Sequence, residues 1–119
     1  MARSSLLLGV AACAVLVATA LPRPASAVLR TAYNLMDMHD TVVQCQDRVQ
    51  KAFTENGFND ISGTHGDPKN DGVFAAYGGY KGVAVCDHEH GVLTLIVVGP
   101  SADTSSSLVQ KVMQALRTQ

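Results

Sequence analysis

Hydrophobic and polar residues follow two different periods along this chain, and each period predicts a different kind of element. Between about residues 41 and 56, apolar residues recur every three or four positions, which is the spacing of one helix face. This stripe consists of Val42, Cys45, Val49, Ala52 and Phe53. We expect Asp40 to cap the helix and Asn56-Gly57 to end it in the left-handed conformation. The pattern therefore predicts an amphipathic helix that buries Cys45.

Three runs rich in β-branched residues follow, at 73–77, 81–86 and 92–98. Gly78-Gly79 predicts a tight turn between the first two runs, and residues 87–91 predict the tip of a second hairpin. Residues 61–64 can add a short fourth strand. Short connections of this kind are typical of an antiparallel meander.

A second helix is predicted after Gly99-Pro100, which stops the third strand. Ser101, Asp103 or Thr104 can cap it. Its apolar stripe has helical spacing and consists of Leu108, Val109, Val112, Met113 and Leu116. The order helix, strands, helix predicts an α+β fold. We expect a three-stranded, possibly four-stranded, antiparallel meander with both helices packed on one face.

The run 92–98 is apolar at every position except Thr94, as expected of a strand covered on both faces. If the helices cover the face of Cys86, then Val83 and Val85 point to the opposite face, because side chains alternate along a strand. That second face needs its own cover. The candidates are the N-terminal arm at 28–38, a second subunit or protein partner, and a ligand. Segment 28–38 is mildly apolar and can be a strand or an ordered arm.

Residues 1–27 have the three-part layout of a cleavable secretory signal. Arg3 supplies the positive start, residues 6–20 form an uncharged run, and Ala25-Ser26-Ala27 has the small-x-small form of a cleavage site. The run is shorter than the roughly 20 residues of a membrane span. A membrane anchor and a lipoprotein attached through Cys13 are the alternatives. Export predicts a periplasmic or secreted protein that starts at Val28, which intact-mass measurement can test.

Removal of the signal leaves Cys45 and Cys86 as the only cysteines. An even pair in an oxidising compartment predicts a disulfide between them. Two free thiols, an intermolecular bridge and metal thiolates are the alternatives. A redox-active role is not expected, because the chain has no Cys-x-x-Cys.

The remaining 28–119 segment has the size of a single small domain. It keeps all ten acidic residues and, without Arg3 and Arg23, seven of the nine basic ones, so its formal charge is −3. No cluster of Lys or Arg is present. We therefore expect neither nucleic acid nor, after signal removal, a membrane as partner.

One group of residues could bind a metal. His88 and His90 would point to the same side of an extended strand, and two such imidazoles can reach one ion. His39 and His65 are the candidate further ligands, with Met36 and Met38 nearby in sequence. Such a set would favour zinc or copper. The simpler interpretation is a polar hairpin tip that faces water.

The sequence contains no catalytic motif. The segment 67–72 begins like a calcium-binding EF-hand loop, but Lys69 and Gly78 stand where the loop requires oxygen ligands, so we expect a turn. We predict a non-enzymatic, cofactor-free binding or interaction module, with loop 64–72 and tip 87–90 as the first places to inspect. The alternative is a periplasmic copper- or zinc-binding protein that uses His88 and His90.

Overall fold

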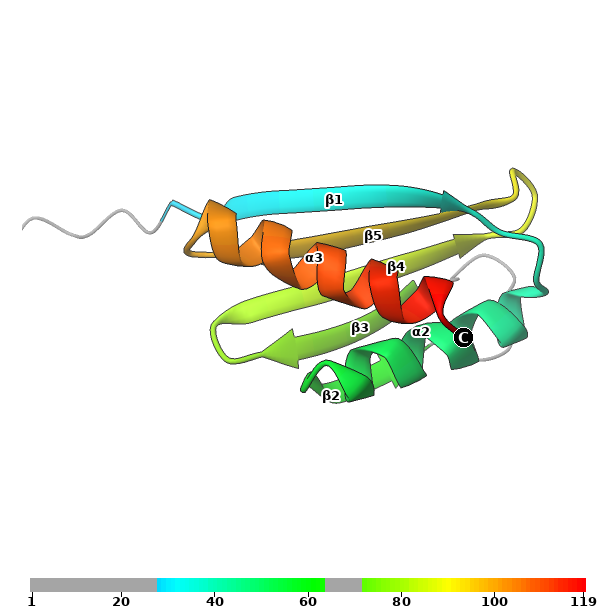
Figure 1. The fold of residues 1–119 in the computed structure, drawn as a ribbon, viewed down its shortest axis with the longest axis horizontal. Helices are drawn as coiled ribbons and strands as arrows, with labels where there is room; N and C mark the ends of the chain where they lie inside the picture. Colours follow the sequence, from blue (N-terminus) through cyan, green and yellow to red (C-terminus); the bar gives the residue numbers. More distant parts are fainter. Residues whose placement is uncertain (1–27, 64–71) are drawn as a thin grey trace, which may run out of the picture.

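The fold is a five-stranded antiparallel sheet with two helices on one of its faces (Figure 1). The computed structural model describes residues 28–63 and 72–119. The elements in chain order are β1 (Arg30–Asp37), α2 (Val42–Glu55), β2 (Asn59–Gly63), β3 (Gly72–Tyr77), β4 (Tyr80–Asp87), β5 (Val92–Gly99) and α3 (Ala102–Arg117). The predicted signal at 1–27 and most of the loop at 64–72 lie outside the described residues.

The sheet has the spatial order β1-β5-β4-β3-β2, so β4 is its middle strand. Strands β2 to β5 form a meander of successive antiparallel neighbours, and β1 pairs with the free side of β5. The α+β class is confirmed. The expectation of three or four strands in the order helix, strands, helix is wrong, because the described fold has five strands and begins with one of them.

Segment 28–38 does not cover the second face of the sheet. Residues Arg30–Asp37 instead form β1, which pairs with β5 from Arg30↔Gly99 to Asp37↔Val92. The sequence pattern of this segment is weak, because an edge strand places its inward face only partly under a helix. Ala32 and Met36 contact the core from that face, while Tyr33 and Leu35 point outward. The expected cover therefore has to come from elsewhere.

Both helices begin at side-chain caps. Thr41 caps α2: its hydroxyl accepts from the backbone N–H of Gln44, whose side chain accepts from the N–H of Thr41. The expectation that Asp40 is the cap is wrong by one residue, because Asp40 forms an ion pair with Arg48 instead. Ser101 caps α3 by accepting from the N–H of Thr104. At its other end, α2 stops at Asn56, and Gly57 has the predicted positive φ of 79°.

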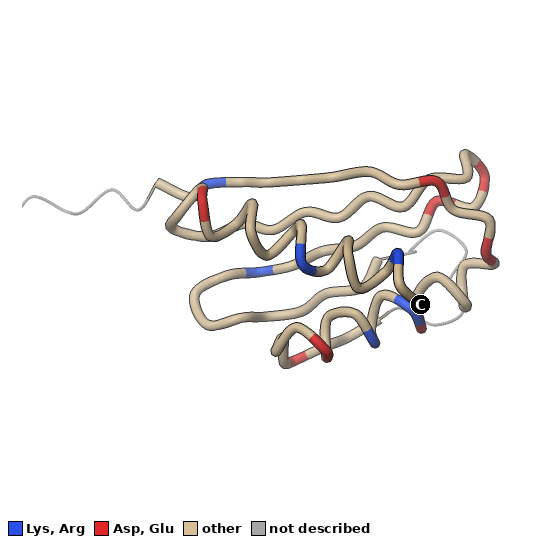
Figure 2. Tube along the Cα trace, viewed as in Figure 1, with Lys and Arg blue, Asp and Glu red and all other residues tan. Residues whose placement is uncertain are grey.

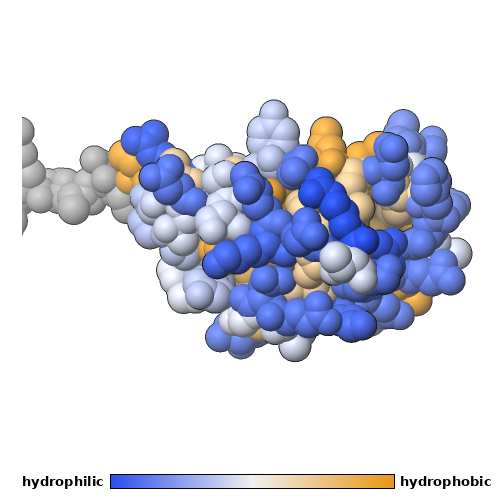
Figure 3. All heavy atoms as spheres, in the orientation of Figure 1, coloured by the Kyte–Doolittle hydropathy of each residue, from blue (hydrophilic) through white to orange (hydrophobic). Residues whose placement is uncertain are grey.

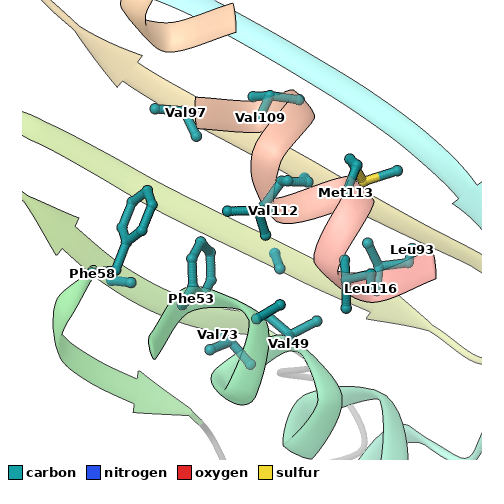
Figure 4. Close-up of a cluster of buried hydrophobic side chains, with 14 of the residues drawn as sticks. Val49, Phe53, Phe58, Val73, Leu93, Val97, Val109, Val112, Met113 and Leu116 are labelled. Atoms are coloured by element: carbon teal, nitrogen blue, oxygen red, sulfur yellow. The ribbon is translucent and has the colours of Figure 1, made fainter. Parts of the chain in front are cut away.

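The hydrophobic core lies between the helices and the inner face of the sheet (Figure 4). Both predicted helix stripes are buried there, apart from half-buried Val42. The pattern did not identify Gln46 and Ser105, which are polar and fully buried. The hydroxyl of Ser105 donates to the backbone oxygen of Arg30, and this bond ties α3 to β1.

A disulfide joins Cys45 of α2 to Cys86 of β4, as the sequence predicted. It closes a loop of 41 residues and therefore stabilises the fold by about 4 kcal/mol in the chain-entropy account. Gly82, Ala84 and Cys86 are all buried on the helix side, so Val83 and Val85 point to the opposite face, again as predicted.

Gly82 allows α2 to approach the sheet. A Cβ placed on it would lie 2.9 Å from the Phe53 ring and 3.2 Å from the Phe58 ring. These two rings pack on each other with centroids 4.9 Å apart, so neither can retreat without disturbing the other.

We predict that Gly82→Ala lowers the free energy of unfolding by about 1–3 kcal/mol, the usual cost of overpacking a core. Gly79→Ala is the matched control, because a Cβ there meets nothing within 4 Å. Urea unfolding monitored by circular dichroism measures both variants. Equal midpoints would show that the rings move aside without cost.

Candidate functional site

The sheet face opposite the helices is not covered by any described element, and we call it the open face. Its residues alternate along each strand with those that face the helices. They are Thr31, Tyr33, Leu35 and Asp37 of β1; Val92, Thr94, Ile96 and Val98 of β5; Lys81, Val83, Val85 and Asp87 of β4; Gly72, Phe74 and Ala76 of β3; and Ser62 of β2. Most of these side chains are apolar.

The largest apolar groups form a continuous row across the open face. Strand register aligns Tyr33 with Ile96, Ile96 with Val83, and Val83 with Phe74. The row is therefore aliphatic at its centre and aromatic at both ends. Tyr33 is 71% exposed and Phe74 45% exposed, while Leu35 and Val85 of the neighbouring row are 53% and 39% exposed. Neighbouring exposed apolar side chains of this kind make the open face a candidate binding surface.

The helix side of the molecule has the opposite character. Figure 3 views that side and shows mostly hydrophilic residues over both helices. Their apolar stripes are already buried in the core. In the part of the chain that the structure describes, exposed apolar side chains are thus gathered mainly on the β1 segment and the open face.

Charged residues on the open face stand at opposite ends of the strands. Lys81 lies near the start of β4, whereas Asp87 ends β4 and Asp37 ends β1. Figure 2 shows this separation on the backbone trace, with red segments at the ends of β1 and β4 and a blue segment near the start of β4. The apolar rows lie between the two charged ends.

The β4–β5 hairpin tip holds two of the predicted site histidines. The backbone N–H of His90 donates to Asp87 Oδ1 over 3.1 Å, and its ring Nδ1 lies 2.8 Å from Asp87 Oδ2. The Nδ1 of His88 lies 3.2 Å from the carbonyl oxygen of Asp40. Because carboxylate and carbonyl oxygens only accept, both Nδ1 atoms carry the donated proton.

These contacts change the acidity of the tip. The pKa of Asp87 is held below its ordinary value, first by the backbone hydrogen bond from His90 and then by the ring. The hydrogen bond to Asp87 raises the pKa of His90, with a further contribution from the charges of Asp87 and Glu89. Asp87 therefore remains a carboxylate over an extended pH range.

The structure does not gather the four histidines into one site. His88 and His90 lie in a turn that follows β4, so the period-two argument for their common direction does not apply. His39 is exposed in the segment between β1 and α2, and His65 lies outside the described residues. Within residues 28–63 and 72–119, no three His, Cys, Asp or Glu side chains form a group that could hold a metal ion.

Three residues of the open face were not identified as site candidates from the sequence. Tyr33 and Leu35 lie in the segment that the sequence predicts as a strand or an ordered arm, and Phe74 lies in a predicted strand. The signal that could have found the first two is their spacing, since residues two apart on a strand share a face. Their exposure follows from the open face having no cover among the described elements.

We predict that Asp87→Asn lowers the pKa of the His90 ring toward its ordinary value, because the largest cause of the increase is lost. Glu89→Gln is the control and lowers the His90 pKa less, since Glu89 acts through charge alone.

The stabilisation that the folded protein gains from protonated His90 is complete below the ordinary pKa of histidine and is lost as pH rises through the raised pKa. That from Asp87 is lost as pH falls through its lowered pKa. A ring-proton NMR titration with an unchanged His90 midpoint in Asp87→Asn contradicts this assignment.

Among the described residues, no helix has the length and apolar character needed to cross a membrane. No protein-family model matches this chain, and no curated protein matches its sequence. The open face and the hairpin tip therefore have to be interpreted from their own chemistry.

Proposed function

We propose that this chain is an exported, non-enzymatic protein-binding module that acts through the open face of its sheet. The observation that carries the proposal is the apolar row from Tyr33 through Ile96 and Val83 to Phe74, which has exposed rings at both ends and half-buried aliphatic side chains between them. This row lies on a face without a covering element among the described residues. Burying such side chains is the main driving force for protein association.

Two observations support an extracytoplasmic location. The disulfide between Cys45 and Cys86 is of the kind that persists in oxidising compartments. Residues 1–27 have the layout of a secretory signal, with cleavage before Val28. A small domain outside the cell gains from a covalent link, because it buries only a modest core.

The residues of the open face suit protein recognition. Tyr33 and Phe74 are aromatic side chains at the two ends of one row, and aromatic residues are enriched at the centres of interfaces. Val83, Val85 and Ile96 are β-branched and sit on rigid strands, so their burial costs little side-chain entropy. Lys81, Asp37 and Asp87 border the apolar rows and can set the orientation of the partner.

A metal-binding tip is the second candidate function, because both histidine rings donate from Nδ1 to an oxygen. This arrangement leaves each Nε2 lone pair available and resembles the outer-shell support of metal-bound histidines. Calorimetric titration with Zn²⁺ and Cu²⁺, compared with His88→Ala/His90→Ala, tests it. Heat of binding that the double variant lacks would support a site at the tip, and a flat trace would exclude one.

We predict that a photo-crosslinking residue placed at Val85 forms a covalent adduct with another protein chain in the producing cell. The same residue at Gln110, on the exposed side of α3, is the control and should remain largely without an adduct. Mass analysis of gel-resolved adducts measures both. If Val85 and Gln110 behave alike, the open face is not the binding surface.

A further inference from the structure

We propose that the open face binds a second copy of this chain, related to the first by a two-fold axis. The axis lies between the two sheets, parallel to their plane and perpendicular to the strands, and it passes above Ala84 of β4. This inference rests on the proposed function, because it names the occupant of the same surface. It is carried by the distribution of charge and bulk on the open face, which is complementary to itself under one particular rotation.

The charge on β4 supplies the first argument. Lys81 and Asp87 lie on the same strand and the same face, three residues to either side of Ala84. Rotation about an axis at Ala84 places Lys81 of each copy over Asp87 of the other, so two identical opposite-charge contacts form. An interface between identical copies with two-fold symmetry repeats each contact in this way.

The distribution of bulk supplies the second argument. The same axis passes above the register positions Asn34, Leu95, Ala84 and Val73, whose side chains face the helices. The rotation therefore places the row that contains Tyr33 and Val83 over the row of the second copy that contains Leu35 and Val85. Tyr33 falls over Leu35 of the second copy and Ile96 over Thr94, while the middle strands bring Val83 over Val85. The Phe74 ring already covers Gly72 of its own chain, where an added Cβ would lie 3.3 Å from the ring.

Charge selects this rotation over the other simple one. An axis parallel to the strands would keep the strand ends together, with Asp37 and Asp87 of one copy near those of the other. Like charges placed opposite each other oppose association. The perpendicular axis instead brings Asp37 over Thr31 and keeps every carboxylate on the open face away from its counterpart.

The geometry of packed sheets allows these contacts. Two sheets stack about 10 Å apart, a distance that a Lys and an Asp side chain can bridge between them. Asp87 uses one acceptor position on each oxygen for His90. A carboxylate has about four such positions, so Asp87 can also accept from the ammonium group of the second copy.

The available area is sufficient for a specific dimer. Four strands spaced about 4.8 Å apart, with up to eight residues rising about 3.3 Å each, give roughly 500 Å² of projected face per copy. Two copies therefore cover about 1,000 Å², which is the size at which specific interfaces begin. Side-chain relief adds to this projected value.

Pairing through a sheet edge, formed by β1 or β2, is the competing arrangement between copies, and one feature of β1 opposes it there. The N–H of Leu35 donates to Asn34 Oδ1 over 2.8 Å. This donor is therefore already used and is not free for an added strand. Occupied edge donors of this kind weaken edge-to-edge association.

The first experiment is sedimentation of the purified, disulfide-bonded protein over a micromolar to millimolar concentration series. We expect a monomer–dimer equilibrium. Val85→Glu should raise the dimer Kd by roughly a hundredfold, because it buries a carboxylate in the interface. Gln110→Glu is the matched control and leaves Kd unchanged. Circular dichroism checks that both variants fold, and Tyr33→Ser gives a second interface variant at a more exposed position.

The second experiment tests the rotation itself. Lys81→Glu alone and Asp87→Lys alone should each weaken dimerisation by roughly tenfold or more, because each places like charges opposite each other twice. An equimolar mixture of the two variants should recover dimers, since the acidic side chains of the first variant then face the basic side chains of the second at both contacts. A dimer with the parallel axis already pairs like charges, so neither single variant weakens it. An edge-to-edge dimer does not juxtapose these positions and should respond to neither variant.

The outcomes separate this inference from the proposed function. A protein that stays monomeric at millimolar concentration overturns the inference, and so do dimers that lack either the weakening in the single variants or the recovery in the mixture. In that case a crosslink from Val85 to a different protein would still support the proposed binding face. Absence of any Val85 crosslink together with a monomer overturns both.

Discussion

The contact between α2 and the middle strand β4 determines the rest of this structure. The Cys45–Cys86 disulfide links the two elements covalently, and Gly82 lets Phe53 and Phe58 lie directly against the strand. Because side chains alternate along β4, this contact assigns every residue of the strand to a face. Val83 and Val85 are directed away from the helices as a consequence, and strand register extends the assignment to β3, β5 and β1.

The core and the proposed binding surface therefore lie on opposite faces of one sheet. The helix face is a closed core in which the apolar stripes of α2 and α3 cover the strands. The open face keeps the apolar character of a core surface but has no cover among the described elements. Exposing such a surface to water has a free-energy cost, which supports the proposed interaction role. In that proposal, the charges at the strand ends set the orientation of the partner, which apolar contacts alone do not fix.

The hairpin tip contributes to this surface through Asp87. The contacts with His90 hold its carboxylate in place and in the charged form at the end of the middle strand. The histidines that suggested metal chemistry from the sequence thus have a second role in this structure: His90 positions an acidic group at the border of the apolar rows. The two roles are compatible, because the Asp87 contact uses the Nδ1 side of the ring.

Local sequence patterns were enough to predict the two helices, the three central strands, the disulfide pair and the face to which Val83 and Val85 belong. Each of these follows from periodicity or from a pairing with one solution. The patterns left residues 28–38 open between a strand and an ordered arm, because this segment is only mildly apolar and its apolar residues fall on both faces of a strand. They also misplaced the cap of α2, which is Thr41 in a capping box with Gln44, while Asp40 forms an ion pair with Arg48. That the second face stays open among the described elements follows from the three-dimensional arrangement alone, because cover is a property of contacts between distant segments, which no local pattern encodes.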